Sequence, residues 1–168
     1  MPVPFPTQIS GALFLADRPR ALLADEPRVG KTGAAIMAAD YVTAERLLII
    51  TTSSGRPVWQ RALKAWSPFA RTAQLVDTKS PYDRKNQSAI VSWGAITNPA
   101  VRAQLLREKW DAVIPDEAHF GKNFSAKRTQ ALYGVLTDGG KWLDNNHALA
   151  AAQPYIWPLT GTPYPNSP

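Results

Sequence analysis

A glycine-lysine-threonine step near the start of the chain has the residue types needed to bind a nucleotide phosphate chain. Gly30, Lys31 and Thr32 follow a short apolar run at residues 21–24 and open into an alanine-rich stretch. Glycine lets the backbone approach an anion, the lysine ammonium can reach the β- and γ-phosphates, and the threonine hydroxyl can bind Mg²⁺. An ordinary helix start is the alternative for this tripeptide alone. The other residues expected to bind the nucleotide surround this step: Asp25, Glu26, Pro27, Arg28, Val29 and Gly33.

Two adjacent carboxylates later in the chain have the chemistry to complete such a site. Asp116 and Glu117 closely follow a predicted short buried strand at residues 111–114. Because ligands of open α/β sheets bind at the carboxyl ends of the strands, we expect Asp116 to lie across from Thr32 and to hold Mg²⁺ through water. Glu117 would orient or deprotonate the attacking water. An acidic pair favoured by a helix dipole is the alternative, and the phosphate loop upstream argues against it. The predicted catalytic residues are Lys31, Asp116 and Glu117, and the predicted metal ligands are Thr32 and Asp116.

The elements that must position these groups alternate between strands and helices. Strands are predicted at residues 21–24, 47–50, 73–76, 89–93, 111–114 and 155–159. Helices are predicted near residues 8–16, 31–42, 57–66, 98–109, 125–136 and 146–152. Continuous apolar runs such as residues 47–50 are typical of strands buried on both faces of a parallel sheet. The predicted fold class is therefore α/β, a mostly parallel sheet covered by helices on both faces.

The composition narrows the class of protein. A chain of 168 residues with 45% hydrophobic residues suits one folded domain. The absence of cysteine excludes disulfides and thiolate zinc sites, and two distant histidines argue against any other zinc site. A net charge of +6 is compatible with a polyanionic partner without being specific for one. No apolar run approaches the ~18 residues of a membrane helix, and the N-terminus lacks the pattern of a signal peptide, so we expect no membrane partner and a cytoplasmic location.

In order and spacing, these segments resemble the first RecA-like domain of superfamily 2 helicase-type ATPases. The resemblance is strongest to the Swi/Snf-like DNA translocases and their phage and bacterial relatives, covers nearly the whole chain and implies a RecA-like P-loop NTPase fold. For a phage-encoded member, the location would be the host-cell cytoplasm. The matching segments are residues 5–8 (Q motif), 24–32 (motif I), 48–54 (motif Ia), 90–93 (the strand before motif II), 110–119 (motif II, the DEAH box), 121–128 (the signature that follows it in the Swi/Snf-like group) and 159–166 (motif III).

The resemblance implies ATP and Mg²⁺ as cofactors and assigns roles to matching positions. Gln8 would read the adenine base, and His119 would couple the ATP site to motif III, with a packed core histidine as the alternative. The implied coupling residues are His119, Thr160, Gly161 and Thr162. The implied nucleic-acid contacts are Thr52, Ser53, Ser54, Lys122 and Asn123, the last two with a solvated helix face as the alternative. Four tryptophans are interpreted as core or strand-flanking residues rather than base-stacking ones: Trp59, Trp66, Trp110 and Trp157.

Three positions depart from the family pattern. Arg28 stands where Swi/Snf-like members usually have glycine, so a side chain restricts the phosphate loop. Pro27 removes one N–H donor from that loop, and Pro115 replaces an aliphatic residue at the end of a strand. Because Gly30, the lysine, the threonine and both acidic residues are present, we expect nucleotide binding to be weakened or altered at most.

Residues 1–168 are expected to form the helicase ATP-binding domain, and the family's second RecA-like domain, which carries the arginine finger, is not among them. The chain is then a fragment of a motor, one half of a split motor or a truncated relative, and turnover by these residues alone is expected to be weak. We expect ATP hydrolysis that drives movement on DNA once a second RecA-like domain or subunit completes the site. The alternative is a non-motor module that binds nucleotide or DNA. The signature after motif II favours duplex DNA, while RNA, the direction of movement and the choice between helicase and translocase stay open.

Overall fold

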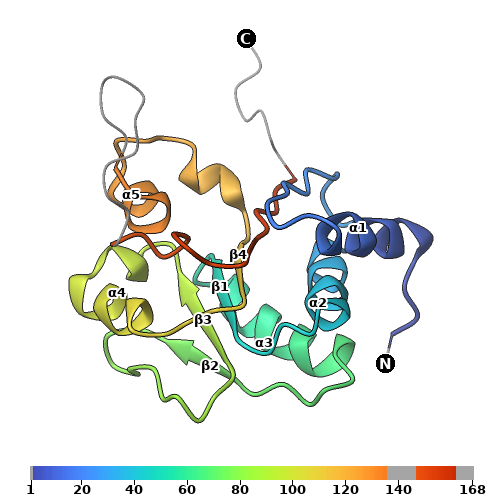
Figure 1. The fold of residues 1–168 in the computed structure, drawn as a ribbon, viewed down its shortest axis with the longest axis horizontal. Helices are drawn as coiled ribbons and strands as arrows, with labels where there is room; N and C mark the ends of the chain where they lie inside the picture. The colour runs from blue at the N-terminus through green and yellow to red at the C-terminus, as the bar shows by residue number, and fades with distance from the viewer. Residues whose placement is uncertain (1, 136–146, 162–168) are drawn as a thin grey trace.

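The computed structural model describes residues 2–135 and 147–161, which build a parallel sheet between two layers of helices (Figure 1). The described strands lie in the order β2-β3-β1-β4-β5, and every paired neighbour is parallel. The strands are β1 (Leu47–Thr51), β2 (Ala73–Val76), β3 (Ser88–Ser92), β4 (Ala112–Pro115) and β5 (Tyr155–Ile156). The helices are α1 (Pro6–Ala16), α2 (Lys31–Tyr41), α3 (Gly55–Trp66), α4 (Pro99–Leu106) and α5 (Lys127–Tyr133), with short 3-10 turns η1 (Ala95–Thr97) and η2 (Ala118–Gly121). The predicted α/β class is confirmed.

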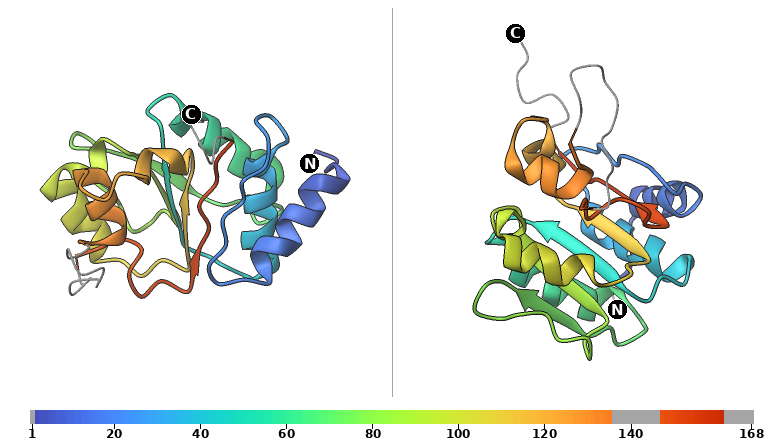
Figure 2. Two further views of the ribbon diagram at one scale, coloured as in Figure 1. Left: turned by 90° about the horizontal axis from the view of Figure 1, so that it is seen from above. Right: turned by 60° about the vertical axis from the view of Figure 1, so that its left-hand side comes forward.

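The central strand β1 is buried on both faces, as its continuous apolar run predicts. Leu47 and Ile49 belong to the core cluster shared with α1, α2 and α3, whereas Leu48 and Ile50 belong to the cluster shared with α4 and α5. Figure 2 shows the two groups of helices on opposite sides of the strands. Side chains alternate across a strand, so four consecutive apolar residues supply both cores.

Helix α2 begins at the sheet edge that carries the predicted site, and its packing fixes it there. It buries a run of small side chains that includes Ala35 and Ala39, which lets the helix approach the sheet closely. Near its last turn, Asp40 accepts hydrogen bonds from Arg71, whose Nη2 lies 2.6 Å from Asp40 Oδ1. Arg71 is only 5% exposed. Charged groups this deep persist when they are paired, so the ion pair anchors the far end of α2.

The prediction of a regular strand at residues 21–24 is wrong. Residues 20–23 run parallel to residues 156–159, with the isolated bridges Arg20–Ile156 and Leu23–Leu159 in place of a continuous ladder. Pro158 has no N–H to donate, so a continuous ladder cannot form at this edge, and β5 itself ends at Ile156 rather than at residue 159. The irregular segment still leads the chain along the sheet directly into the phosphate loop.

Several predicted helix boundaries also shift. Helix α4 begins at Pro99 after an Asn98 cap, as predicted, but ends at Leu106 rather than at residue 109. The helix predicted at residues 146–152 is not formed over its described part, which consists of turns. Helix α5 is shorter at both ends than predicted, and residue 136 lies outside the described residues. Within the described ranges, no helix is long and apolar enough to cross a membrane.

Candidate functional site

The phosphate loop and the segment after β5 lie in contact at one edge of the sheet. Leu23 and Thr160 are joined by the hydrogen bond from Thr160 N to Leu23 O, at 3.1 Å. Further along both segments, Gly161 packs against Pro27 so closely that an added Cβ would lie 3.0 Å from Pro27 Cγ. The proline that interrupts the loop's N–H donors is therefore packed against another predicted site residue.

The phosphate loop turns sharply into α2 with two residues in the left-handed region. Arg28 has φ of 69° and Gly30 has φ of 84°. Glycine adopts this conformation readily, whereas a residue with a side chain is strained there, so the predicted restriction at Arg28 is present in the backbone. Lys31 Nζ donates to the carbonyl oxygens of Asp25 and Glu26, at 2.9 and 2.8 Å. The lysine ammonium thus lies along the loop, beside the start of α2.

Gln8 is buried and makes a hydrogen bond to the phosphate loop. Its side chain is 4% exposed, its Nε2 donates to Gly30 O at 3.1 Å, and its Oε1 accepts from Phe5 N at 2.9 Å. An added Cβ on Gly30 would collide with this amide. The structure thus joins Gln8 to the loop, while its implied role in reading adenine stays a prediction.

A groove of about 620 Å³ runs between α1 and the phosphate loop. Thr7, Ser10 and Phe14 line it from α1. From the loop side, the lining includes the predicted site residues Asp25, Glu26 and Val29. The groove is large enough for a nucleobase and begins beside the loop expected to hold the phosphates.

Asp116 lies just beyond β4 and is held by hydrogen bonds from three other elements. Its Oδ2 accepts from Thr51 Oγ1 at the end of β1 and from Trp59 Nε1 on α3, both at 2.8 Å. Its main-chain oxygen accepts from Trp93 Nε1 at 2.8 Å. Among the described residues, no hydrogen bond is made to Asp116 Oδ1. The described donors therefore fix one of the two carboxylate oxygens.

Glu117 adopts the left-handed conformation, with φ of 53° and ψ of 49°. Non-glycine residues in this region are uncommon and concentrate at functional sites. The Glu117 side chain is 45% exposed, and His119 Nδ1 lies 3.2 Å from Glu117 Oε2. The bend therefore turns the glutamate away from the core and places a histidine beside it.

The predicted coupling residues lie close to motif II along the backbone. Leu159 N donates to Pro115 O, and Ala118 N donates to Leu159 O, both at 2.8 Å. These bonds place Thr160 and Gly161 beside the turn that contains Glu117. Thr162, the last predicted coupling residue, lies outside the described residues.

The predicted nucleic-acid contacts form two separate exposed groups. Ser53 and Ser54 are exposed in the loop between β1 and α3, and Thr52 is partly buried beside them. Lys122 and Asn123 are exposed after η2, where Asn123 Oδ1 accepts from Ser125 N and Oγ. The first group directly follows Thr51, so it is joined through one residue to the Asp116 carboxylate.

Comparison with known proteins decides the family. No protein-family model matches the chain. It is 33% identical over 141 residues to the "SWI/SNF-related matrix-associated actin-dependent regulator of chromatin subfamily A-like protein 1 homolog" of Caenorhabditis elegans, covering 82% of this chain and 20% of that protein. It is 30% identical over 139 residues to the "DNA annealing helicase and endonuclease ZRANB3" of Bos taurus, covering 78% of this chain and 13% of that protein. The chain thus spans a fifth or less of the length of these relatives.

Solved structures show the same fold. The "SWI2/SNF2 ATPase core in complex with dsDNA" of Sulfolobus solfataricus matches 96% of this chain with a TM-score of 0.76 at 19% identity, over 32% of its own chain. The UvsW helicase of bacteriophage T4 matches 95% of this chain with a TM-score of 0.60 at 14% identity, over 52% of its own chain. The chain is a RecA-like domain of the Swi/Snf-like helicase family.

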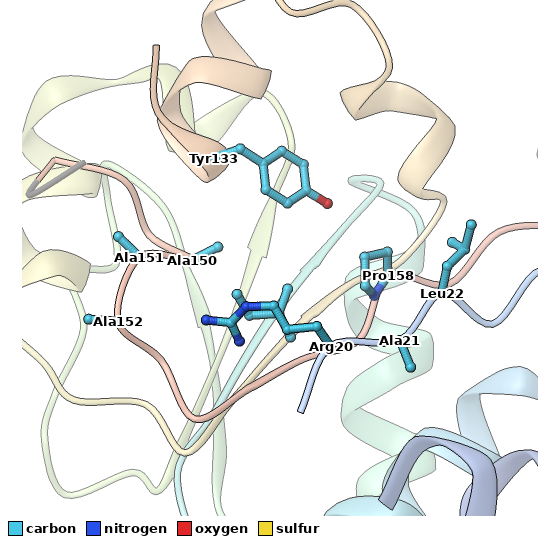
Figure 3. A pocket seen from close by; sticks show the side chains of 9 residues that line it. Arg20, Ala21, Leu22, Tyr133, Ala150, Ala151, Ala152 and Pro158 are labelled. Carbon is cyan, nitrogen blue, oxygen red and sulfur yellow. The ribbon is translucent and has the colours of Figure 1, made fainter. Parts of the chain in front are cut away.

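A second cavity of this RecA-like domain, of about 680 Å³, contains none of the predicted site residues. Figure 3 shows Tyr133 pointing into it from α5, with Arg20 and Pro158 on the other side and alanines 150–152 along the wall. Burial raises the pKa of Tyr133 to about 12, so its hydroxyl is protonated at neutral pH. Apart from Arg20 and Tyr133, the side chains that line the cavity are apolar.

Three residues that contact Asp116 in this RecA-like domain were not predicted to belong to the site. The sequence predicts a core position for Trp59, which is confirmed at 1% exposure, but gives no sign of its hydrogen bond to Asp116. Thr51 ends β1, and Trp93 directly follows β3, which is far from β1 in the sequence. Their hydrogen bonds to Asp116 depend on the directions of side chains on different strands, and the spacing of residues along the sequence does not predict these directions. Trp110 and Trp157 are buried as predicted, and Trp66 is partly buried.

The loop geometry predicts that Gly30→Ala destabilises the domain. The left-handed φ costs a residue with a Cβ about 1–2 kcal/mol, and the methyl group would also displace the buried Gln8 amide. Thermal unfolding followed by circular dichroism should show a Tm lowered by several degrees.

Gly94→Ala is the matched control for this substitution. Gly94 has φ of −72°, and the nearest atom to an added Cβ there is Ser92 Oγ at 4.0 Å. We expect the Tm of this variant to equal that of the unsubstituted chain. Equal Tm values for both variants would contradict the close fit between Gly30 and Gln8.

Proposed function

We propose that this RecA-like domain binds ATP with Mg²⁺ and hydrolyses it to drive movement on DNA when a second RecA-like domain or subunit completes the site. The observation that carries the proposal is the gathering of the phosphate loop, Asp116 and the segment around Gly161 at one sheet edge. These groups come from three distant parts of the chain. Together they offer a cation, free helix N–H groups and carboxylates, which are the groups that phosphoryl transfer requires.

The start of α2 supplies the phosphate-binding groups. Its first N–H groups, at Lys31, Thr32 and Gly33, have no partner within the helix and carry the positive end of the helix dipole. Lys31 Nζ, which now donates to two loop carbonyls, would exchange these bonds for bonds to the β- and γ-phosphates. The groove beside α1 would then take the base.

The residues proposed to hold the metal fit Mg²⁺ by their chemistry. A threonine hydroxyl at Thr32 and a carboxylate at Asp116 are hard oxygen ligands, which Mg²⁺ prefers and commonly supplements with water and phosphate oxygens. Asp116 has one oxygen fixed by protein donors and one without such a donor among the described residues. When bound, Mg²⁺ would neutralise charge that develops on the phosphates.

Glu117 is proposed to orient and deprotonate the attacking water. It follows Asp116 directly, and its backbone lies in the left-handed region. Its 45% exposure leaves the carboxylate accessible to a water molecule. His119, at 3.2 Å from the same carboxylate, would connect this step to Thr160 and the segment beyond it.

The proposed DNA contacts lie on the loop after β1 and on the segment after η2. Exposed hydroxyls at Ser53 and Ser54, and the exposed Lys122 and Asn123, suit contacts to phosphate oxygens. A relative named as a DNA annealing helicase and a solved relative in complex with dsDNA support DNA as the nucleic acid. The second RecA-like domain is proposed from the resemblance, since an arginine finger in other phosphate-loop enzymes accelerates hydrolysis by ~10³–10⁵.

Replacing Lys31 tests the phosphate site. Lys31→Ala should weaken binding of a fluorescent ATP analogue about tenfold or more, because a charge-assisted hydrogen bond contributes about 1.5–3 kcal/mol. Fluorescence anisotropy of the purified chain measures the affinity. Lys85→Ala, at an exposed lysine between β2 and β3, is the control and should bind as tightly as the unsubstituted chain. If both variants bind alike, the phosphates lie elsewhere.

ATP hydrolysis tests the need for a second domain. We expect the chain alone to bind ATP but to release phosphate at a rate about 10³–10⁵ lower than a complete motor, with or without duplex DNA. Phosphate release is compared with that of Glu117→Gln, which removes the proposed base. Rapid DNA-stimulated release that is abolished in Glu117→Gln would show that these residues already form a complete site. No nucleotide binding at all would contradict the proposed function.

A further inference from the structure

The Asp116 carboxylate is held in place by two hydrogen bonds from other parts of the protein. Two donors, Thr51 Oγ1 and Trp59 Nε1, converge on the same oxygen, Oδ2, each at 2.8 Å. They come from different elements, the end of β1 and the first half of α3. Two donors on one oxygen fix the rotation of the carboxylate about its Cβ–Cγ bond as well as its position.

The main chain of Asp116 is fixed independently of its side chain. Asp116 N donates to Ile50 O at 2.7 Å, which continues the pairing of β4 with β1. Asp116 O accepts from Trp93 Nε1 at 2.8 Å, at the end of β3. The main chain of Asp116 is thus held by β1 and by Trp93, and the contacts at Oδ2 add control over the orientation of the carboxylate.

Both donors to Oδ2 are buried, which strengthens their effect. Thr51 and Trp59 are each 1% exposed. A hydrogen bond to a carboxylate is stronger where water is excluded, and a buried indole N–H without an acceptor would be unfavourable. Packing alone would account for a buried tryptophan, but it would not require its N–H to point at this oxygen.

We propose that Thr51 and Trp59 are positioning residues that orient the Asp116 carboxylate toward Mg²⁺. The inference rests on the proposed function and adds to it the groups that set the direction of the metal-binding oxygen. By holding Oδ2, the two donors reserve Oδ1 for the water shell of the metal. Groups that orient a metal-binding side chain in this way affect metal affinity by about 10–100-fold when they are replaced.

The test uses substitutions that remove each donor, and a control that reproduces the loss of volume when tryptophan is replaced by phenylalanine. Trp59→Phe loses the indole N–H, and Thr51→Val loses the hydroxyl. Trp110→Phe is the matched control, because Trp110 is also 1% exposed and donates from Nε1 to Leu105 O at 3.0 Å, away from Asp116. Thermal unfolding of all three variants establishes that each is folded, and the loss of Tm in Trp59→Phe should be close to that in Trp110→Phe.

The readout is the Mg²⁺ concentration that gives half-maximal enhancement of nucleotide binding, measured with a fluorescent ATP analogue. Trp59→Phe and Thr51→Val should raise this concentration about tenfold or more, while their affinity for the analogue in excess EDTA stays that of the unsubstituted chain. Trp110→Phe should change neither value.

Two results would overturn the inference, and only one of them would also contradict the proposed function. If Trp59→Phe and Thr51→Val need the same Mg²⁺ concentration as Trp110→Phe, the two donors are structural and the proposed nucleotide site stands. If the unsubstituted chain shows no Mg²⁺-dependent nucleotide binding, both the inference and the proposed function are wrong.

Discussion

The candidate site depends on the hydrogen bonds that Asp116 accepts. They join the ends of β1 and β3, the helix α3 and the turn after β4 at a single residue. They add to main-chain bonds that already join the strand ends, such as Trp93 N to Thr51 O and Asp116 N to Ile50 O. The loop at residues 52–54 and the acidic pair therefore share Thr51 and Asp116 as a common support.

The phosphate loop illustrates how strain is tolerated when its surroundings hold it. Arg28 and Glu117, both non-glycine residues, occupy the left-handed region. The Gln8 amide donates to Gly30 O, and Gly161 packs on Pro27. Backbone strain of this kind persists where the surrounding structure holds it, and it is common at functional sites.

Much of this arrangement could be predicted from the sequence, because it follows from local patterns. Apolar runs such as residues 47–50 predict buried parallel strands, and parallel strands bring their carboxyl ends to one edge. The residues that donate hydrogen bonds to Asp116 could not be predicted in the same way. Thr51 and Trp93 act through side-chain direction across strands, and Trp59 has the burial of any core tryptophan. The irregular edge beside β5 was missed because Pro158 prevents a ladder that the apolar pattern favours.

The start of α2 and Asp116 are proposed to form one site for Mg²⁺ and nucleotide. A crystal structure of the chain with a non-hydrolysable ATP analogue and Mg²⁺ would show whether they do. We expect the phosphates on the N–H groups that begin α2, and the metal between the Thr32 hydroxyl and Asp116, with Asp116 reached through water. A nucleotide bound elsewhere, or a metal that Asp116 does not approach directly or through water, would contradict it.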